Sequence, residues 1–197
     1  LIYKFTYDGL GRTIGTKDPR TDTTTTNYNE KGQVYYVHDF DEHPTYYEYD
    51  DVTGQLKKIT RGDGNQYTTL FDYDRGRIKH TWGSAAYPVG NDYDDYGQRT
   101  KLHTYGETED SDWTDTENEW PSVGGGVITQ WINDPATGHI TEKIYDLQTD
   151  YGGGTAPSVK YKYTRGGALY ERTWIRKQSN NAPVTTNYTY YPKTGEL

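Results

Sequence analysis

Acidic side chains are most concentrated in residues 107–119, which contain seven Asp or Glu residues and no Lys, Arg or His. Clustered carboxylate oxygens are the ligands that calcium prefers, so a calcium site is one interpretation of this segment. The spacing does not follow the Asp-x-Asp-x-Asp-Gly pattern of the common calcium loop. The segment therefore favours a solvated loop, and calcium binding stays open as the alternative.

Catalytic arrangements are absent from the sequence in recognisable form. Paired carboxylates would suit glycoside hydrolysis, but such a pair needs a cleft and one raised pKa, which a sequence does not reveal. The histidines form neither an HExxH nor an HxH motif, and no serine lies in a GxSxG motif. The residues concerned are His38, His43, His80, His103, His139, Ser84, Ser111, Ser122, Ser158 and Ser179. We expect no enzyme activity and assign no catalytic, cofactor-binding or metal-binding residue.

Four short motifs have a functional and an ordinary interpretation. Gly124–Gly126 and Gly152–Gly154 lack the flanking residues of a phosphate loop, so flexible turns are favoured. Arg61-Gly62-Asp63 spells an integrin-binding tripeptide, but it falls where a turn is expected. Asn187-Tyr188-Thr189 is a glycosylation sequon, which has meaning only in a eukaryotic secretory context.

The tryptophans provide the chemistry for a second class of function. Exposed indole rings stack on sugar rings, and the five candidates are Trp82, Trp113, Trp120, Trp131 and Trp174. Trp113 and Trp120 lie in or beside the acidic segment, so a sugar-binding role and a structural role are about equally favoured for them. The sequence thus leaves a carbohydrate-binding surface open as an alternative.

Composition limits the partners and the fold. A net charge of −8 and a pI near 5.1 argue against a nucleic-acid partner, because phosphate contacts require clustered Lys and Arg. No apolar run approaches the length of about 18 residues that a membrane-spanning helix needs. Cys and Met are both absent, so no disulfide or thiolate site forms, and we expect the chain to be an internal or processed piece without its own export signal. The 22 Tyr and 5 Trp favour a β-rich fold with an aromatic core.

The sequence also contains a repeat that would position these groups. A tyrosine, an Asp- or Asn-containing turn and a glycine recur along the whole chain. The glycines are Gly11, Gly32, Gly54, Gly76, Gly97, Gly138, Gly167 and Gly195, with separations of 21, 22, 22, 21, 41, 29 and 28 residues. The period weakens in two irregular insertions, near 103–130 and 147–158.

Each repeat predicts a β-hairpin. Aromatic residues two positions apart, such as Phe5 and Tyr7, place both rings on one face of a strand. The Asp-x-x-Gly sequence after the tyrosine predicts a type I turn in which the glycine takes a positive φ. Two strands and two turns account for about 21 residues at the usual strand length of about 5–6 residues. Ladders between neighbouring hairpins are therefore the favoured role of the repeat tyrosines.

These motifs resemble the RHS, or YD-repeat, family, whose signature is Tyr-Asp-x-x-Gly-Arg followed by Leu or Ile. Residues Tyr7–Arg12, Tyr73–Ile78 and Tyr47–Leu56 carry the resemblance best. The resemblance implies a β-strip that coils into a hollow cage, which in bacterial members encloses a toxic C-terminal polypeptide. In animal relatives it implies an extracellular adhesion module. Asp134-Pro135-Ala136-Thr137-Gly138 is similar to the sequence at which bacterial RHS cores end, with one residue inserted, but an ordinary turn is favoured.

The expected molecule is an all-β array of about eight tandem antiparallel hairpins over residues 1–197, cut from a longer secreted or cell-surface protein. The resemblance implies a structural shell segment without a cofactor. Its partners would be the remaining repeats of its own chain, and either an enclosed toxin polypeptide or a surface carbohydrate. An adhesive or carbohydrate-binding surface module is the alternative.

Overall fold

The computed structural model describes residues 2–41, 43–62, 67–105, 120, 126–145, 156–179 and 182–191. Every regular element within these ranges is a β-strand. The strands are β1 (Lys4–Tyr7), β2 (Thr13–Lys17), β3 (Thr23–Tyr28), β4 (Val34–His38), β5 (Pro44–Tyr49), β6 (Leu56–Arg61), β7 (Tyr67–Asp74), β8 (Arg77–Trp82), β9 (Val89–Tyr93), β10 (Arg99–Thr104), β11 (Val127–Asn133), β12 (Ile140–Ile144), β13 (Ser158–Tyr163), β14 (Leu169–Lys177) and β15 (Pro183–Asn187). The described part of the chain contains no helix with the length and apolar character needed to cross a membrane.

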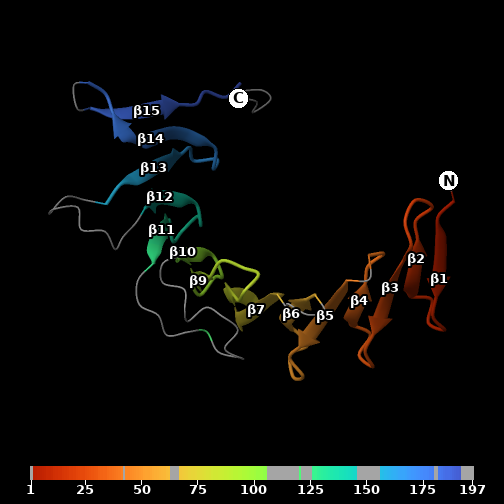
Figure 1. Cartoon of the computed structure of the whole chain (residues 1–197). Coiled ribbons are helices and arrows are strands. Elements are labelled where there is room, and N and C mark those ends of the chain that lie inside the picture. Colours follow the sequence, from red (N-terminus) through yellow and green to blue (C-terminus); the bar gives the residue numbers. More distant parts are fainter. Residues whose placement is uncertain are drawn as a thin grey trace. The chain divides into compact units, whose positions relative to one another are not determined.

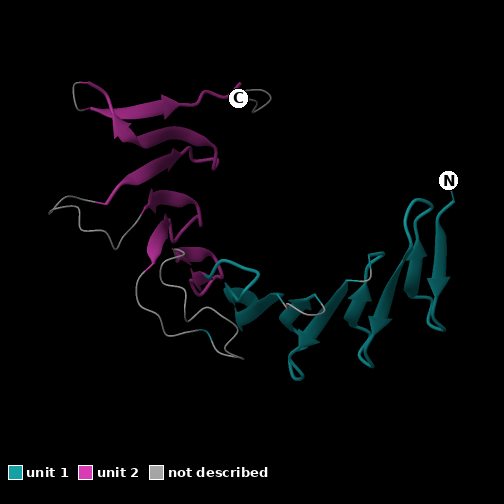
Figure 2. Cartoon of the chain, in the orientation of Figure 1, with its two compact units in different colours: residues 1–88, 109–122 teal, residues 89–108, 123–197 magenta. Residues whose placement is uncertain are grey.

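The chain forms two compact units, which are coloured separately in Figure 2. Unit 1 comprises Leu1–Pro88 with Glu109–Ser122, and unit 2 comprises Val89–Thr108 with Val123–Leu197. Within unit 1, strands β1 to β8 pair in chain order, and within unit 2, strands β9 to β15 do the same (Figure 1). Every recorded pairing joins consecutive strands and is antiparallel. This confirms the predicted all-β fold of tandem antiparallel hairpins.

The turns of the repeat have the predicted backbone. Gly11, Gly32, Gly97 and Gly167 have φ angles of 78°, 79°, 82° and 84°. A tyrosine that ends a strand precedes each of them by four residues. In the first turn the Gly11 amide donates to the Asp8 carbonyl at 3.0 Å, and the Asp8 amide donates to the Arg12 carbonyl at 2.9 Å. A tight turn closed by a left-handed glycine is one of the common hairpin connections.

Three turns differ in length from this pattern. The Gly54 and Gly138 amides donate to the carbonyls of Asp50 and Asp134, four residues earlier, so these loops are one residue longer. The turn between β7 and β8 is shorter, and both Arg75 and Gly76 have positive φ, at 47° and 83°. Two consecutive left-handed residues are typical of a type I′ turn rather than the predicted type I turn. The sequence Asp74-Arg75-Gly76 has one residue fewer than the Asp-x-x-Gly pattern, and this shortening changes the turn type but preserves the hairpin.

Each of the seven hairpins in the described ranges contains a β-bulge at the same place. In the first hairpin Tyr7 is opposite Thr13 while Thr6 is opposite Gly15, so Ile14 is an additional residue in the return strand. The additional residues of the other hairpins are Tyr35, Lys57, Lys79, Thr100, Thr141 and Tyr170. A bulge bends its strand and increases the local twist, and here it lies beside a tyrosine in six of these hairpins and beside Asn133 in the hairpin of β11 and β12.

The described core is small and local. In unit 1, Leu70 and Trp82 lie directly opposite each other on β7 and β8 and are only 1% and 2% exposed. Thr60 and Thr68 are buried beside them. In unit 2 the buried hydrophobic residue is Val159 of β13. Most other strand residues are half-buried, as expected where each hairpin packs mainly against its neighbours.

Candidate functional site

The repeated structural feature of this chain is a wedge between neighbouring hairpins at the end where the glycine turns lie. Pairing between β6 and β7 covers only Lys58–Arg61 of β6, so Leu56 and Lys57 have no strand partner in β7. The β2–β3, β4–β5 and β12–β13 pairings are similarly limited to three residue pairs each. Because the hairpins separate at this end, backbone carbonyls of the return strands need another hydrogen-bond donor.

A tyrosine at or near the end of the next outgoing strand provides that donor: Tyr73 is the last but one residue of β7, and Tyr190 lies three residues beyond β15. In each case its hydroxyl donates to the carbonyl of the first residue of the preceding return strand. The bonds are Tyr28 to Thr13 at 3.0 Å, Tyr49 to Val34 at 2.7 Å, Tyr73 to Leu56 at 2.8 Å, Tyr163 to Ile140 at 2.9 Å and Tyr190 to Leu169 at 2.7 Å. The ring fills the wedge and its hydroxyl satisfies the exposed carbonyl, which gives the tyrosine of the repeat a physical role.

Burial keeps these phenols in the donating form. Burial raises the pKa of Tyr49, Tyr73 and Tyr163, because removing the ring from water disfavours the phenolate. The hydroxyls therefore retain their protons at all moderate pH values and donate to the carbonyls. The wedge is predicted to be insensitive to pH around neutrality.

Replacement of Tyr73 by phenylalanine is expected to destabilise unit 1 by about 1–2 kcal/mol, because the Leu56 carbonyl loses its donor while the ring still fills the wedge. Tyr96→Phe is the matched control, since Tyr96 is 83% exposed, and we expect almost no change. Amide hydrogen exchange in β6 and β7 measures the effect of Tyr73→Phe, and exchange in β9 and β10, which flank Tyr96, measures the effect of the control. If Tyr73→Phe changed exchange in its own hairpins no more than the control does in β9 and β10, the role of the hydroxyl would be contradicted.

The residue after each turn glycine covers the next turn along the sheet. Gln33 Nε2 donates to the Gly54 carbonyl at 2.8 Å, and Gln98 Nε2 donates to the Gly138 carbonyl at 3.1 Å. A Cβ atom on Gly138 would lie 2.6 Å from Gln98 Nε2 and would displace this flexible side-chain amide, and the φ of 73° at residue 138 itself favours glycine. The turns therefore form a continuous row within each unit, in which one hairpin positions the next.

Aromatic stacking reinforces this row. The Arg12 guanidinium lies 4.4 Å from the centre of the Tyr28 ring, and the His139 ring stacks on Tyr163 at 4.6 Å. In both cases the residue after one turn glycine covers the tyrosine of the next hairpin. Contacts between cations and aromatic faces contribute about 0.5–1 kcal/mol each at exposed sites. The sequence repeat of Tyr, Gly and a polar residue thus encodes contacts between hairpins.

The turn carboxylates are occupied by local backbone donors. Asp8 Oδ1 accepts from the amides of Leu10 and Arg12, both at 2.9 Å, and Asp50 Oδ1 accepts from the amide and hydroxyl of Thr53. These hydrogen bonds, foremost those from the Arg12, Thr53 and Thr137 amides, lower the pKa of Asp8, Asp50 and Asp134. A glycosidase acid needs a raised pKa, so the turn carboxylates have the opposite property.

The stability of the turns is expected to fall only in acid. A lowered pKa in the folded state means that Asp50 contributes stability above the unfolded value near 3.8, and that this contribution is lost as the pH falls below it. Carboxyl-carbon NMR titration of Asp50 and Asp134 should give midpoints below 3.8. Asp50→Asn should remove the acid-dependent change in its own turn and leave the Asp134 turn unchanged. A midpoint above 3.8 for Asp50 would contradict this explanation.

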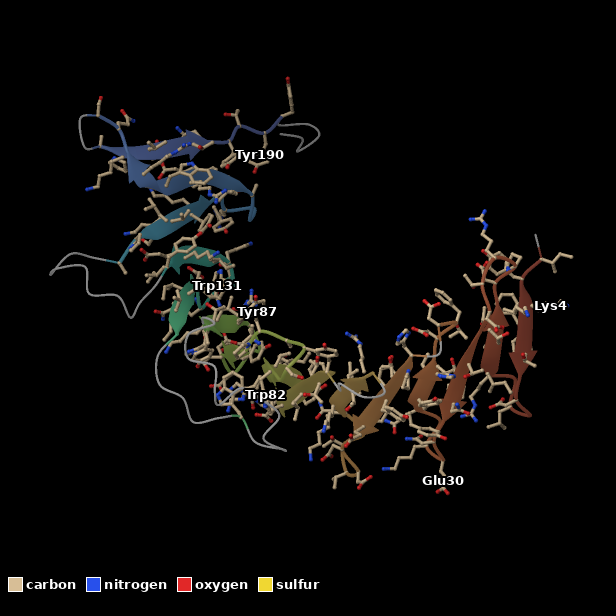
Figure 3. All side chains as sticks on the ribbon, in the orientation of Figure 1. Lys4, Glu30, Trp82, Tyr87, Trp131 and Tyr190 are labelled. Atoms are coloured by element: carbon tan, nitrogen blue, oxygen red, sulfur yellow. The ribbon has the colours of Figure 1, made fainter. Side chains whose placement is uncertain are left out.

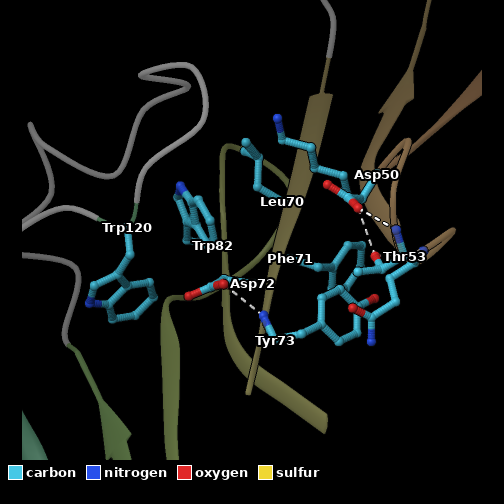
Figure 4. Close-up of a pocket in the computed structure, with 10 residues that line it drawn as sticks. Asp50, Thr53, Leu70, Phe71, Asp72, Tyr73, Trp82 and Trp120 are labelled. Atoms are coloured by element: carbon cyan, nitrogen blue, oxygen red, sulfur yellow. Dashed lines mark hydrogen bonds between the residues drawn. The ribbon is translucent and has the colours of Figure 1, made fainter. Parts of the chain in front are cut away.

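A cavity of about 530 Å³ opens beside the Tyr73 ring, between the hairpins of β5–β6 and β7–β8 (Figure 4). Phe71 and Tyr73 lie on the side of β7 that faces the Asp50–Thr53 turn, and Trp82 and Trp120 lie on the other side in Figure 4. Its carboxylates already have partners, because Asp72 accepts from the Tyr73 amide at 2.7 Å and contacts His80 Nδ1 at 3.0 Å. The cavity is thus an opening between two hairpins that is lined by engaged polar groups.

The structure does not bring the candidate metal ligands together. His80 contacts Asp72, His103 Nε2 lies 3.1 Å from Asp92 Oδ2, and His43 lies 3.7 Å from Asp39. His139 stacks on Tyr163, and His38 lies against the Tyr36 ring. Within the described ranges, no three His, Asp or Glu residues are placed to share a metal ion. The histidines instead contact a nearby aspartate or stack on rings.

The tryptophans that the structure describes are engaged by their own chain. Trp120 stacks on His80 at 4.1 Å and meets the buried Trp82 edge-on at 5.7 Å. Trp131 is covered by Arg99 and Lys143, and Trp174 by Arg172 at 3.7 Å. A sugar-binding platform needs an open ring face, so these contacts favour a structural role for Trp120, Trp131 and Trp174.

Several candidate residues lie outside the described residues. They are the acidic segment 107–119 with Trp113, Ser111 and Ser122, two of the three glycines in 124–126, the glycines of 152–154, Asp63 of the Arg-Gly-Asp tripeptide, and Gly195. The remaining motif residues occupy ordinary positions. Asp134–Gly138 is the turn between β11 and β12, and Asn187 ends β15. Ser84 accepts from the Thr68 amide at 2.9 Å, which is a packing role that its sequence context did not indicate.

Two solved structures of TcdB2-TccC3 chains have a similar fold. The chain matches TcdB2-TccC3-Cdc42 over 99% of its length, with 13% identity and a TM-score of 0.53. It matches TcdB2-TccC3 without the hypervariable C-terminal region over 96% of its length, with 13% identity and a TM-score of 0.50. No protein-family model matches the chain, and no curated protein is significantly similar to it. The chain spans only 11% and 12% of the length of these two chains, so the likeness concerns the fold of a segment within them.

Proposed function

We propose that the chain is a structural, non-enzymatic segment of an RHS-type β-strip whose hairpins form part of a wall around an enclosed polypeptide. The observation that carries the proposal is the tyrosine wedge. Five tyrosine hydroxyls bind the carbonyl of the preceding hairpin in the same way, so each hairpin is built to be followed by another. The fold likeness to TcdB2-TccC3 chains over nearly the whole chain supports the same function.

The first strand supports a role within a longer array. Tyr7 occupies the same position as the wedge tyrosines but is 57% exposed, and Tyr3 and Phe5 beside it are also exposed. The strand itself has a partner only in β2 among the described strands. An unpaired strand edge with exposed rings is a ready template for another strand. The partner that fits is the return strand of a further hairpin, so the proposed partners are more repeats of the same kind.

Secretion or display at the cell surface is part of the same proposal, because a wall around a polypeptide is useful for delivery outside the cell. The resemblance of the YD repeats to RHS proteins supports it. The carbohydrate-binding alternative has less support, because the described tryptophans have their rings covered.

Sedimentation of the purified 197-residue chain tests the proposal. We expect concentration-dependent association through the β1 edge, and we expect Phe5→Lys to reduce it, because charged side chains on an edge strand oppose edge-to-edge pairing. Ile175→Lys, at a 45% exposed position within β14, is the control with the same type of change. A monomer at all concentrations would contradict the array. Saturable binding to a glycan array that is lost in Trp120→Ala would instead establish the sugar-binding alternative.

A further inference from the structure

The two faces of the sheet in unit 2 carry different charges. Residues directly opposite each other on paired strands share a face, and alternate residues of one strand do so as well. Trp131 is opposite Lys143, Lys143 is opposite Val159, and Tyr161 is opposite Arg172. Because Tyr161 and Tyr163 alternate along β13, this is the face that carries the wedge tyrosine. We call it the tyrosine face of unit 2.

Every charged strand residue on the tyrosine face of unit 2 is a cation. Arg99 is opposite Tyr93, and Arg176 follows Arg172 and Trp174 at spacing two on β14. The acidic residues of the same strands, Asp92, Glu142 and Glu171, are opposite Lys101, Lys160 and Lys162 on the other face. The chain as a whole has a net charge of −8, so this separation of charge is a local property of the face.

The four cations of this face lie against aromatic rings. The Arg99 guanidinium is 4.5 Å from the Trp131 ring centre, and Lys143 Nζ is 5.4 Å from Trp131 and 4.6 Å from Tyr145. The Arg172 guanidinium is 3.7 Å from Trp174 and 5.5 Å from Tyr161, and Arg176 is 5.7 Å from Trp174. Stacking holds a guanidinium in a fixed plane and leaves its N–H groups at the edge of that plane free to bind an acceptor. In Figure 3, Trp131 marks the position of this row in unit 2.

These cations have unused hydrogen-bonding capacity. Among the described residues, Arg172 Nε is buried and has no hydrogen-bond partner. Within the same part of the chain, Arg99 makes a long contact, 3.5 Å, with the neutral Asn91 amide oxygen. In the described ranges, none of the four cations pairs with a carboxylate, whereas Lys160 and Lys162 on the opposite face pair with Glu142 and Glu171 at 3.7 and 2.8 Å.

We propose that the tyrosine face of unit 2 binds an acidic polypeptide segment, whose Asp and Glu carboxylates pair with Arg99, Lys143, Arg172 and Arg176. The charge of the face selects for anions, and the stacked guanidinium groups suit the two oxygens of a carboxylate. The proposal deepens the proposed function, since it names the chemistry of a polypeptide that a wall of such hairpins would contact.

A polypeptide fits this face better than a nucleic acid. Single-stranded nucleic acids bind by stacking bases on open aromatic faces, and here Trp131 and Trp174 are already covered by cations. The remaining surface is acidic, and it would repel the closely spaced phosphates of a nucleic acid more strongly than the scattered carboxylates of a protein. Carboxylate pairing needs only the cations that the face provides.

Fluorescence anisotropy with labelled poly-L-glutamate tests the proposal on the 197-residue chain. We expect binding at low salt that weakens as salt is added. Arg172→Gln with Arg176→Gln should weaken the binding by roughly tenfold or more, because two charge-assisted contacts are lost. The matched control is Lys160→Gln with Lys162→Gln, which removes the same charge from the opposite face of the same unit, and we expect binding to be unchanged.

The other outcomes overturn the proposal. Equal weakening in the two double variants would mean that net charge alone drives binding. Tighter binding of single-stranded DNA than of poly-L-glutamate at equal charge would assign the face to a nucleic acid. Arg99→Gln gives a second test on a different strand, in case the β14 variant loses its β-sheet circular dichroism. These results do not depend on self-association through β1, so failure here and failure of the array model are distinguishable.

Discussion

Gly83→Ala is expected to lower the stability of unit 1 by about 2–5 kcal/mol, the combined cost of a left-handed residue with a Cβ atom and of overpacking. Gly83 follows β8 directly and has a φ of 117°. A Cβ atom there would lie 2.5 Å from the Thr68 carbonyl oxygen and 3.1 Å from Leu70 Cδ1. Because the closest atom belongs to the backbone, a side-chain rotation does not relieve the clash.

The required movement would also break hydrogen bonds that hold the segment after β8. The Ala85 amide donates to the Thr68 carbonyl at 2.8 Å, and the Thr68 amide donates to Ser84 Oγ at 2.9 Å. We therefore expect faster amide hydrogen exchange in β7 and β8. We also expect a change in tryptophan fluorescence, because Trp82 would lose its buried surroundings. Exchange is the better measure, because a chain with two compact units does not have to unfold in one step.

Gly9→Ala is the matched control. Gly9 has no atom within 4 Å of an added Cβ and is not in the left-handed region, so the change should be neutral or slightly stabilising. If Gly83→Ala changed the stability of unit 1 as little as Gly9→Ala, β7 could not lie as close to residue 83 as the structure shows.

The hairpins were predictable because their signals are local. A strand-ending tyrosine, an Asp or Asn that accepts backbone amides, and a glycine with positive φ all lie within five residues of each other. Local hydrogen bonding and the lack of a Cβ determine such turns with little help from the rest of the chain. This explains why the φ angles at Gly11, Gly32, Gly97 and Gly167 were confirmed. The turns at Gly54, Gly76 and Gly138 differ in length and adopt other local hydrogen-bond patterns, and the shortest of them, at Arg75 and Gly76, has the backbone of a type I′ turn.

The wedge and the bulge were not predictable in the same way. Spacing placed the repeat tyrosines in ladders between hairpins, but it did not indicate that each hydroxyl would bind a carbonyl of the hairpin before it. That bond depends on the register between hairpins and on the bulge that separates them, which involve residues at least 15 positions apart. Gly83 lies outside the repeat, so no pattern distinguished it from other glycines. The charge separation in unit 2 likewise emerges only when register assigns each residue to a face.

Leu70→Ala is expected to destabilise unit 1 by about 2–5 kcal/mol, the usual range for a large-to-small change in a packed core. Leu70 is 1% exposed and lies between Lys58 of β6 and Trp82 of β8, so no mobile surface is available to fill the space. Leu10→Ala is the same change at a turn position that is 80% exposed, and we expect an effect below about 0.5 kcal/mol.

The comparison of these two leucine variants tests how a single-layered sheet is stabilised. If each hairpin depended only on backbone pairing and the tyrosine wedge, the two changes would differ little. A large difference, measured by hydrogen exchange in β6 to β8, would show that the cluster of Thr60, Thr68, Leu70 and Trp82 is a local core. The stability of a repeat array is approximately the sum of the stabilities of its units and of the interfaces between them. Such a core would therefore let the β5–β8 hairpins fold first and provide a template for their neighbours. Exchange that stayed slow in Leu70→Ala would instead assign the stability of unit 1 to the interfaces between hairpins.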